Sequence, residues 1–282
     1  MIKLIECPRD AMQGLQDFIP TETKANYINK LLRCGFDTID FGSFVSPKAI
    51  PQLKDTAAVL DKLELEEGCS NLLAIVANLR GAQEAVQFEQ ITYLGFPLSV
   101  SETFQQRNTN KSIAEAMLNV AEIQNLCQQH GKTLVTYLSM GFGNPYDDPY
   151  SPEVISTFVE RLNNLQVEVV SLADTIGVGD PDTIKSLFET LIPAYPHIEF
   201  GAHLHATPDT IIEKLEAALD GGCNRFDGAI KGFGGCPMAK DDLVGNMATE
   251  VMLEYFQKRQ VPTAVNREAF AEALAEAPKV FS

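Results

Sequence analysis

The 282-residue sequence lacks several features that mark particular classes of protein. Its 22 Lys and Arg residues are outnumbered by 38 Asp and Glu residues, and a net charge of −16 repels nucleic acid and anionic membranes. No window approaches ~18 consecutive apolar residues, and the N-terminal MIKLIECPRD lacks the apolar core and cleavage site of a secretory signal. We therefore expect a cytoplasmic protein with no nucleic-acid or membrane partner.

Closely spaced cysteine pairs are also missing. Six cysteines are dispersed through the chain without any C-x-x-C pair, which indicates reduced thiols rather than a disulfide framework or a zinc knuckle. Nothing resembles a linker, a low-complexity tract or a solenoid repeat, and a hydrophobic content of 45% is ordinary for a globular protein. We expect one catalytic domain that covers residues 1–282.

Eight short apolar runs alternate with longer amphipathic segments, for which Thr21 and Ser151 are two expected N-caps. The expected strands are 2–7, 36–42, 72–78, 90–95, 133–140, 167–173, 198–205 and 223–230. This alternation predicts an α/β fold, a single (β/α)8 TIM barrel, with an extra C-terminal helix after about residue 258. A doubly wound sheet is the alternative, but it usually has a Gly-rich phosphate turn where this chain reads CPRDAMQG.

Active sites of such barrels lie at the carboxyl ends of the strands. His203 and His205 in EFGAHLHAT emerge on one face of a strand, so both can reach one cation. In the other interpretation one histidine is hydrogen-bonded inside the barrel mouth and the other is solvated. Barrel closure brings the last strand beside the first, where Asp10 and an amide such as Asn246 could complete a hard ligand set suited to Mg²⁺ or Mn²⁺.

Two further residues can carry chemistry at this mouth. Arg9 beside a cation could stabilise an oxyanion, or it could form an ordinary salt bridge to Asp40 or Asp174. Cys236 lies in the Gly-rich segment GFGGCP, where a thiol could transfer a proton, although most cysteines are small buried hydrophobes.

Five motifs, ECPRDAMQ, SFVSPKAIPQ, DTIGVG, HLH and GFGGCPMAKDDLVGNMATE, lie in order along almost the whole chain. Together they resemble the 3-hydroxy-3-methylglutaryl-CoA lyases, a family of metal-dependent TIM-barrel lyases within a superfamily that includes Claisen-type enzymes. The segments SFVSPK and GGCP matter most, because the related condensing synthases generally lack them. The resemblance implies retro-Claisen cleavage of the acyl-CoA substrate, with Mg²⁺ or Mn²⁺, to acetoacetate and acetyl-CoA.

The resemblance also implies roles for particular residues. The implied metal ligands are Asp10, His203, His205 and Asn246, and the implied catalytic residues are Arg9, Asp40, Asp174, His203 and Cys236. Gln13 and Ser43 would line the acyl pocket, while Lys48, Arg107 and Lys111 are candidate contacts for the CoA phosphates.

Among the departures of the chain from the family pattern, two concern the expected site directly. Asp40 stands where the family usually has glutamate, and Ala206 follows the second histidine where the family usually has aspartate. Other hypotheses are a citramalate- or isopropylmalate-type synthase, a hydroxy-keto-acid aldolase, and a barrel that binds metal or ligand without turnover. Barrels often pair through exposed helices, so a homodimer is an open alternative to a monomer.

Overall fold

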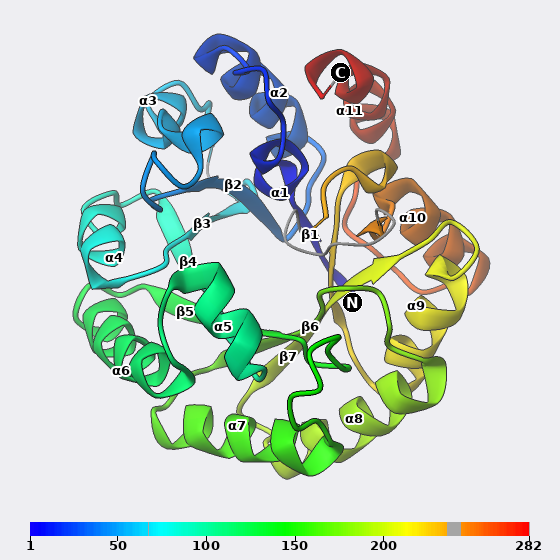
Figure 1. Ribbon diagram of the computed structural model, residues 1–282. Helices are drawn as coiled ribbons and strands as arrows, with labels where there is room; N and C mark the ends of the chain where they lie inside the picture. Colours follow the sequence, from blue (N-terminus) through cyan, green and yellow to red (C-terminus); the bar gives the residue numbers. More distant parts are fainter. Residues whose placement is uncertain (67, 236–243, 282) are drawn as a thin grey trace.

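Eight parallel strands form a closed barrel in the computed structural model, which describes residues 1–66, 68–235 and 244–281. Each strand pairs with its neighbours in chain order, β6 pairs with β7, and β8 pairs with β1 to close the ring (Figure 1). The strands are β1 (Lys3–Glu6), β2 (Thr38–Ser43), β3 (Asn71–Ile75), β4 (Ile91–Ser99), β5 (Thr133–Ser139), β6 (Val169–Asp174), β7 (Glu199–Ala206) and β8 (Arg225–Gly228). The predicted TIM barrel is confirmed.

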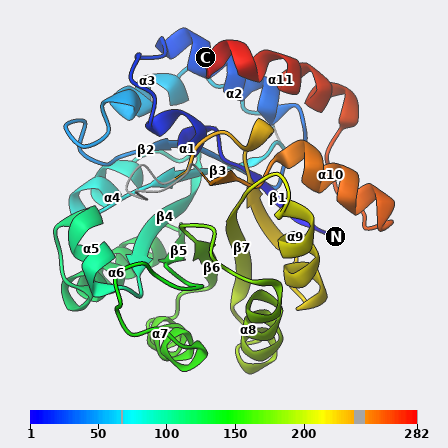
Figure 2. The same cartoon turned by 45° about the vertical axis from the view of Figure 1, so that its right-hand side comes forward.

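A ring of helices surrounds the strands, as Figures 1 and 2 show from two directions. The helices are α1 (Pro8–Gln13), α2 (Thr21–Leu32), α3 (Thr56–Leu60), α4 (Leu79–Ala85), α5 (Glu102–Thr109), α6 (Ile113–Gln129), α7 (Pro152–Asn164), α8 (Pro181–Ala194), α9 (Ile211–Asp220), α10 (Thr249–Lys258) and α11 (Arg267–Val280). The extra C-terminal helix is α11. It packs beside α2. Phe270 of α11 lies edge-on to Phe36, which precedes β2, with ring centroids 6.2 Å apart.

The alternation of side chains along each strand separates two apolar layers. On β5, Leu134 and Leu138 belong to the large core between strands and helices. Val135 and Tyr137 belong instead to a small cluster inside the barrel, together with Leu73 of β3. The barrel interior is therefore packed with side chains, and its inward-facing residues near the carboxyl ends of the strands are those that can face a substrate.

Of the two expected N-caps, one was wrong and one is confirmed. Thr21 is the first residue of α2 rather than its cap, because its hydroxyl donates a hydrogen bond to Asp55 at 2.7 Å. Ser151 caps α7 as predicted, accepting a hydrogen bond from the backbone N–H of Val154 at 3.4 Å. The sequence also gave no sign of β9 (Gly245–Asn246), a short strand that pairs antiparallel with the end of β7.

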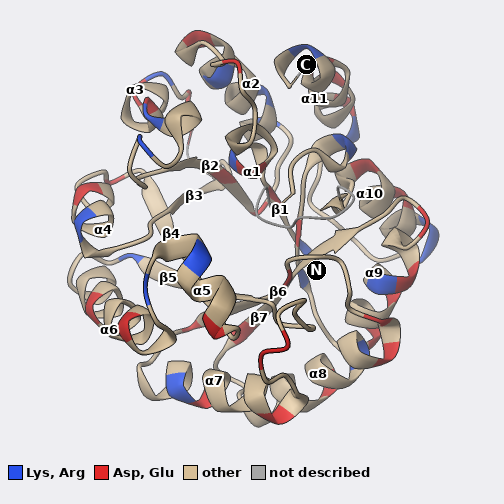
Figure 3. Cartoon of the chain, in the orientation of Figure 1, with Lys and Arg blue, Asp and Glu red and all other residues tan. Residues whose placement is uncertain are grey.

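Charged residues are spread over the outer helices, with acidic ones in the majority (Figure 3). Within the described part of the chain, no helix combines the length and the apolar composition that crossing a membrane requires.

Candidate active site

The residues that follow β1 place two charges in the mouth of the barrel. Only Cys7 separates β1 from α1, and Pro8 occupies the first helical position, where a missing N–H costs nothing. Arg9 and Asp10 therefore lie in the first turn of α1, 8% and 7% exposed. Buried charges at this depth need partners, so their contacts define the site.

Arg9 is held by three acceptors. Its Nε and Nη2 donate to the carboxylate of Asp40 at 2.9 Å and 2.5 Å, and its Nη1 donates to Asp10 and to Gln13, each at 2.8 Å. From the sequence, Arg9 was expected as an alternative to form a salt bridge with Asp40 or Asp174. The salt bridge forms with Asp40, whereas Asp174 pairs with Lys214. Asp40, although one methylene shorter than the glutamate usual in the family, reaches the guanidinium from β2.

Burial and charge oppose each other in this pair. Burial raises the pKa of Asp40 to about 6 despite the neighbouring guanidinium of Arg9. Burial also acts to lower the pKa of Arg9, but the negative charges of Asp40 and Asp10 outweigh it, so the pKa of Arg9 is raised and the residue stays cationic. The site therefore contains a fixed positive charge whose orientation depends on Asp40.

The two histidines of β7 lie together with Asp10. His203 and His205 have ring centroids 5.3 Å apart, and one ligand atom from each, with a carboxylate oxygen of Asp10, falls within 4.8 Å of the others. This geometry is consistent with two predictions: that both histidines emerge on one face of their strand, and that Asp10 lies beside them. The three residues could hold one metal ion.

Hydrogen bonds determine which nitrogen of His205 is available. Its Nδ1 lies 3.0 Å from the carbonyl oxygen of Thr175, and a carbonyl can only accept, so Nδ1 carries the proton. The buried Nε2 has no hydrogen-bond partner among the described residues. A buried nitrogen left unpaired is costly, and an unprotonated Nε2 aimed at Asp10 and His203 suits a cation.

The pKa values of His205 and Asp10 agree with a role as ligands. Burial lowers the pKa of His205 to about 4, so its imidazole is neutral near pH 7. Burial would raise the pKa of Asp10, but Arg9 and the two imidazoles outweigh it and lower the value to about 2. A neutral imidazole and an ionised carboxylate are the forms that bind metal ions.

Asn246 of β9 completes the group. It pairs with His205 in the antiparallel ladder, which places it beside β7. Its Nδ2 donates to Asp10 at 2.7 Å and to the backbone oxygen of Phe233 at 2.9 Å. Both amide protons are used in this way, so the amide oxygen is the atom left to bind a cation.

Asp174 lies outside this group. Its carboxylate accepts hydrogen bonds from Lys214 of α9 at 2.7 Å and from the backbone N–H groups of Val178 and Gly179. Lys214 also donates to the backbone oxygen of His205 at 3.0 Å. The pair joins the segment after β6 to β7 and α9, and so supports the carbonyl that orients His205.

The structural role of Lys214 was not predicted from the sequence, although its position in the helix pattern indicates a buried lysine. It occupies the apolar stripe of α9 between Ile211 and Leu215, and it is only 3% exposed. A lysine at such a position must have a buried partner. Lys214 donates to the backbone oxygen of His205, which directly precedes Ala206. The family usually has aspartate at the position of Ala206.

A cavity of about 420 Å³ opens above the group. Its lining includes Arg9, Asp10, Gln13, His203 and His205. It also includes four apolar residues, Val45, Ala49, Ile50 and Ile75, and four residues of α5, Phe104, Arg107, Asn108 and Thr109. A second cavity, of about 570 Å³, lies at the opposite end of the barrel against the start of β1 and contains none of the clustered residues.

Two other predicted residues lie outside the cavity lining, and a third falls outside the described part of the chain. Ser43 is buried and donates to the backbone oxygen of Ile75 at 3.2 Å, and it does not line the cavity. Lys48 is exposed and also lies outside the cavity lining. Cys236 lies outside the described residues.

Comparisons with known proteins agree with this geometry. The chain is 34% identical to hydroxymethylglutaryl-CoA lyase YngG of Bacillus subtilis, covering 94% of this chain and 88% of that protein. It is 31% identical to the mitochondrial hydroxymethylglutaryl-CoA lyase of Mus musculus, covering 96% and 83%. A lyase of Pseudomonas aeruginosa named for 3-hydroxy-3-isohexenylglutaryl-CoA and hydroxymethylglutaryl-CoA is 31% identical over 96% of this chain and 90% of its own.

Solved structures give the same result. An HMG-CoA lyase from Acinetobacter baumannii in complex with coenzyme A and 3-methylmalate superposes with a TM-score of 0.92 at 28% identity, covering all of this chain and 91% of that one. The HMG-CoA lyase of Bacillus subtilis superposes equally well at 32% identity, covering 99% and 93%. A family model described as HMGL-like matches residues 2–276, and the chain belongs to this HMGL-like family.

Proposed function

We propose that this protein is a hydroxymethylglutaryl-CoA lyase, which cleaves 3-hydroxy-3-methylglutaryl-CoA to acetoacetate and acetyl-CoA. The observation that carries the proposal is the convergence of Arg9 with Asp10, His203 and His205 on one cavity. The relatives with this name match nearly the whole chain, which supports the assignment. The same similarity disfavours a synthase, an aldolase and a barrel without turnover.

The donor set fits a hard divalent ion, Mg²⁺ or Mn²⁺. The ion would be held by Asp10, His203, His205 and Asn246, and the unpartnered Nε2 of His205 supports this assignment. Bound there, it would supply a Lewis acid that polarises oxygen atoms of the substrate. The resident ion and its four ligands remain part of the proposal.

Arg9 is suited to stabilise the charge that develops during cleavage. As the carbon–carbon bond breaks, its electron pair moves into the thioester and forms an enolate, while acetoacetate leaves. Arginine has five N–H donors, and Arg9 directs four of them to Asp40, Asp10 and Gln13. One N–H on Nη2 remains for the enolate oxygen, held in place before the reaction begins.

Two proton transfers balance the reaction. The proton of the tertiary hydroxyl must pass to a base, and the carboxylate of Asp10 lies in the cavity lining. The enolate carbon then takes up a proton to give acetyl-CoA. We assign that step to Cys236, following the family resemblance, although this residue lies outside the described part of the chain.

The anionic CoA moiety needs a local positive charge in a protein of net charge −16. Arg107 of α5 lines the cavity, and its guanidinium carbon lies 4.7 Å from the ring centroid of Tyr146. Figure 3 shows positive charge on α5 near the barrel mouth. We assign the phosphate contact to Arg107 rather than to Lys48 or Lys111, because Lys48 lies outside the lining and Lys111 donates to Asn119 at 3.0 Å.

Two assays, one for cleavage and one for condensation, test the proposal. Purified protein with Mg²⁺ or Mn²⁺ should convert 3-hydroxy-3-methylglutaryl-CoA to acetoacetate and acetyl-CoA in equal amounts. Acetyl-CoA with pyruvate or with 2-oxoisovalerate, the substrates of the rival synthases, should give no condensation product. Condensation without cleavage would replace the lyase proposal with the synthase hypothesis.

A further inference from the structure

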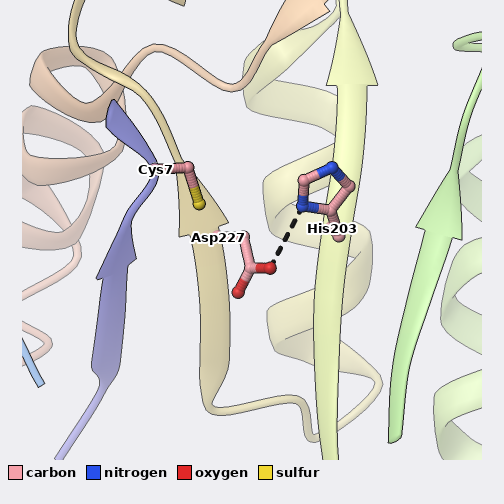
Figure 4. A group of neighbouring side chains, drawn as sticks. All are labelled: Cys7, His203 and Asp227. Atoms are coloured by element: carbon pink, nitrogen blue, oxygen red, sulfur yellow. Dashed lines mark hydrogen bonds and ion pairs between the residues drawn. The ribbon is translucent and has the colours of Figure 1, made fainter. Parts of the chain in front are cut away.

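Asp227 of β8 contacts a proposed metal ligand without being one of the four. Figure 4 shows its carboxylate between β8 and β7, with one oxygen directed at the ring of His203. The distance from His203 Nδ1 to Asp227 Oδ2 is 3.1 Å. The other ring nitrogen points away from Asp227 (Figure 4). His203 also forms a group with Asp10 and His205, and this nitrogen is the one left for it.

The register of the barrel explains this contact. Gly201 of β7 pairs with Arg225 of β8, so the residues two positions further on, His203 and Asp227, share the next inward-facing layer. Asp227 is 2% exposed and His203 is more open, since it lines the cavity. The carboxylate therefore supports the imidazole from the barrel interior, on the side away from substrate.

A buried cation lies in the layer below Asp227. Arg225 is 1% exposed, and its Nη1 donates to Glu199 at 3.2 Å. Burial acts to lower the pKa of Arg225, but nearby negative charges outweigh it and raise the pKa. The largest of these opposing effects comes from Asp227. Gly201 makes room for this side chain, because a Cβ there would lie 3.2 Å from Cδ of Arg225. Opposite charges in adjacent layers allow both residues to be buried.

We propose that Asp227 is a positioning residue for His203: it holds the proton on Nδ1 and fixes the ring so that Nε2 faces the metal site. Carboxylates that accept the second N–H of a ligating histidine commonly act in this way. His205 receives the same support from the carbonyl of Thr175. The two ligands thus have different supports, one charged and one neutral. The proposal rests on the metal site of the proposed function.

Cys7 lies against the same pair and suggests a competing assignment. Ligand atoms of Cys7, His203 and Asp227 lie within 4.8 Å of one another, so this group could itself hold an ion (Figure 4). The direct hydrogen bond between His203 and Asp227 argues against it, because an ion there would take both of the bonded atoms as ligands. Burial also raises the pKa of the Cys7 thiol well above its usual value, which disfavours the thiolate.

The tautomer of His203 is the first test, and it requires neither metal nor activity. The chain has only four histidines, so selective ¹⁵N labelling of histidine gives an assignable spectrum. In metal-free protein at about pH 9, where free imidazole is neutral, we expect the Nδ1–H form for His203. A wild-type protein with the Nε2–H form would overturn the proposal. Because the protein is metal-free, this result is independent of whether the lyase assignment holds.

Substitution of Asp227 gives the second test. In Asp227→Ala, we expect a mixture of tautomers at His203 and a loss of ~10–100-fold in Mn²⁺ affinity, measured from the electron paramagnetic resonance signal of free Mn²⁺. Asp227→Asn retains an acceptor and should keep the Nδ1–H form. Glu6→Ala, which removes another buried acidic side chain, is the control and should leave the tautomer and the Mn²⁺ affinity unchanged.

Two outcomes would contradict the positioning role. If Asp227→Ala keeps the wild-type tautomer and Mn²⁺ affinity, or if Glu6→Ala loses as much affinity, Asp227 contributes only to stability. If Co²⁺-loaded protein shows a thiolate-to-metal charge-transfer band that Cys7→Ser abolishes, the ion is bound by the Cys7 group and Asp227 is a ligand.

Discussion

The role proposed for Arg9 depends on the neighbours that determine where its guanidinium points. Asp40 takes its Nε and one Nη2 proton, while Asp10 and Gln13 take the two protons of Nη1. Replacement of the family glutamate by Asp40 does not break this arrangement, because the shorter side chain on β2 still reaches Arg9. Asp40 does not line the cavity, so the role we propose for it is to position Arg9.

Substitution of Arg9 by glutamine is expected to affect turnover more than ion binding. Losing a preorganised donor at a developing oxyanion typically lowers the rate ~10²–10³-fold, and we expect this loss in kcat. The Mn²⁺ affinity should be retained, since Asp10, His203 and His205 are unchanged. Steady-state kinetics and Mn²⁺ titration of the same preparation check both results. Lost Mn²⁺ affinity with normal turnover per bound ion would assign Arg9 to ion binding instead.

Arg107 gives a prediction for substrate affinity. We expect Arg107→Gln to raise KM for the acyl-CoA about tenfold, the factor for ~1.4 kcal/mol, with little change in kcat, because a phosphate contact contributes equally to ground and transition states. Lys48→Gln is the matched control: it removes the same charge from a residue outside the cavity lining. Equal increases in KM for the two variants would indicate a general charge effect.

At the scale of elements, the segment after β6 is held by a buried ion pair. Lys214 of α9 donates to Asp174, to the backbone oxygen of Gly177 and to the backbone oxygen of His205. The carbonyl of Thr175, in the same segment, accepts the proton of His205. The orientation of His205, one of the proposed metal ligands, therefore depends on how α9 is joined to the end of β6.

Lys214→Met should destabilise the protein, because it leaves Asp174 buried without its cation. Breaking a buried ion pair from one side typically costs ~3–5 kcal/mol, which urea unfolding can measure. The double variant Lys214→Met, Asp174→Leu removes both charges and should recover part of that loss. Strictly additive losses in this cycle would mean that the two residues do not interact.

The sequence predicted the order of these elements well, but not every detail of them. The eight alternating strand and helix segments were sufficient to predict the barrel. Ser151 was sufficient to predict where α7 begins. Thr21 failed as a cap because tertiary structure placed Asp55 within reach of its hydroxyl. β9 was not predictable, since two residues have no periodicity and pair with β7 only once the barrel exists.

At the scale of the whole molecule, Glu6 links the first strand to the end of the barrel. Its carboxyl oxygens accept hydrogen bonds from the backbone N–H of Ile230 at 2.8 Å and from the hydroxyl of Thr249 at 2.6 Å. It is 1% exposed, and burial raises its pKa to about 8 despite these two donors. Glu6 is therefore largely uncharged near pH 7.

This shift predicts a dependence of stability on pH. Between pH 4.5 and about 8 the folded state holds a proton on Glu6 that the unfolded state has lost, so stability falls as pH rises. From pH 6 to pH 8, we expect the wild type to lose about 2 kcal/mol more of its free energy of unfolding than Glu6→Gln does. Urea unfolding at both pH values measures the difference. Equal losses in the two proteins would contradict the neutral form.

The candidate site could be predicted only in part, for reasons of distance along the chain. The spacing of His203 and His205 was visible, and barrel closure justified the expectation that Asp10 and Asn246 lie beside them. Which nitrogen each histidine presents could not be predicted. That choice depends on Thr175 and Asp227, whose contacts arise from the register of neighbouring strands.

Ion-dependent cleavage of 3-hydroxy-3-methylglutaryl-CoA is the measurement that tests the central claim most directly. We predict that chelator-treated protein, checked to be folded, releases neither product and that Mg²⁺ or Mn²⁺ restores equimolar acetoacetate and acetyl-CoA. Asp10→Asn and His205→Gln should prevent this recovery, since each removes a donor from the group. Release that continues undiminished without an ion, or no release with either ion, would contradict the assignment.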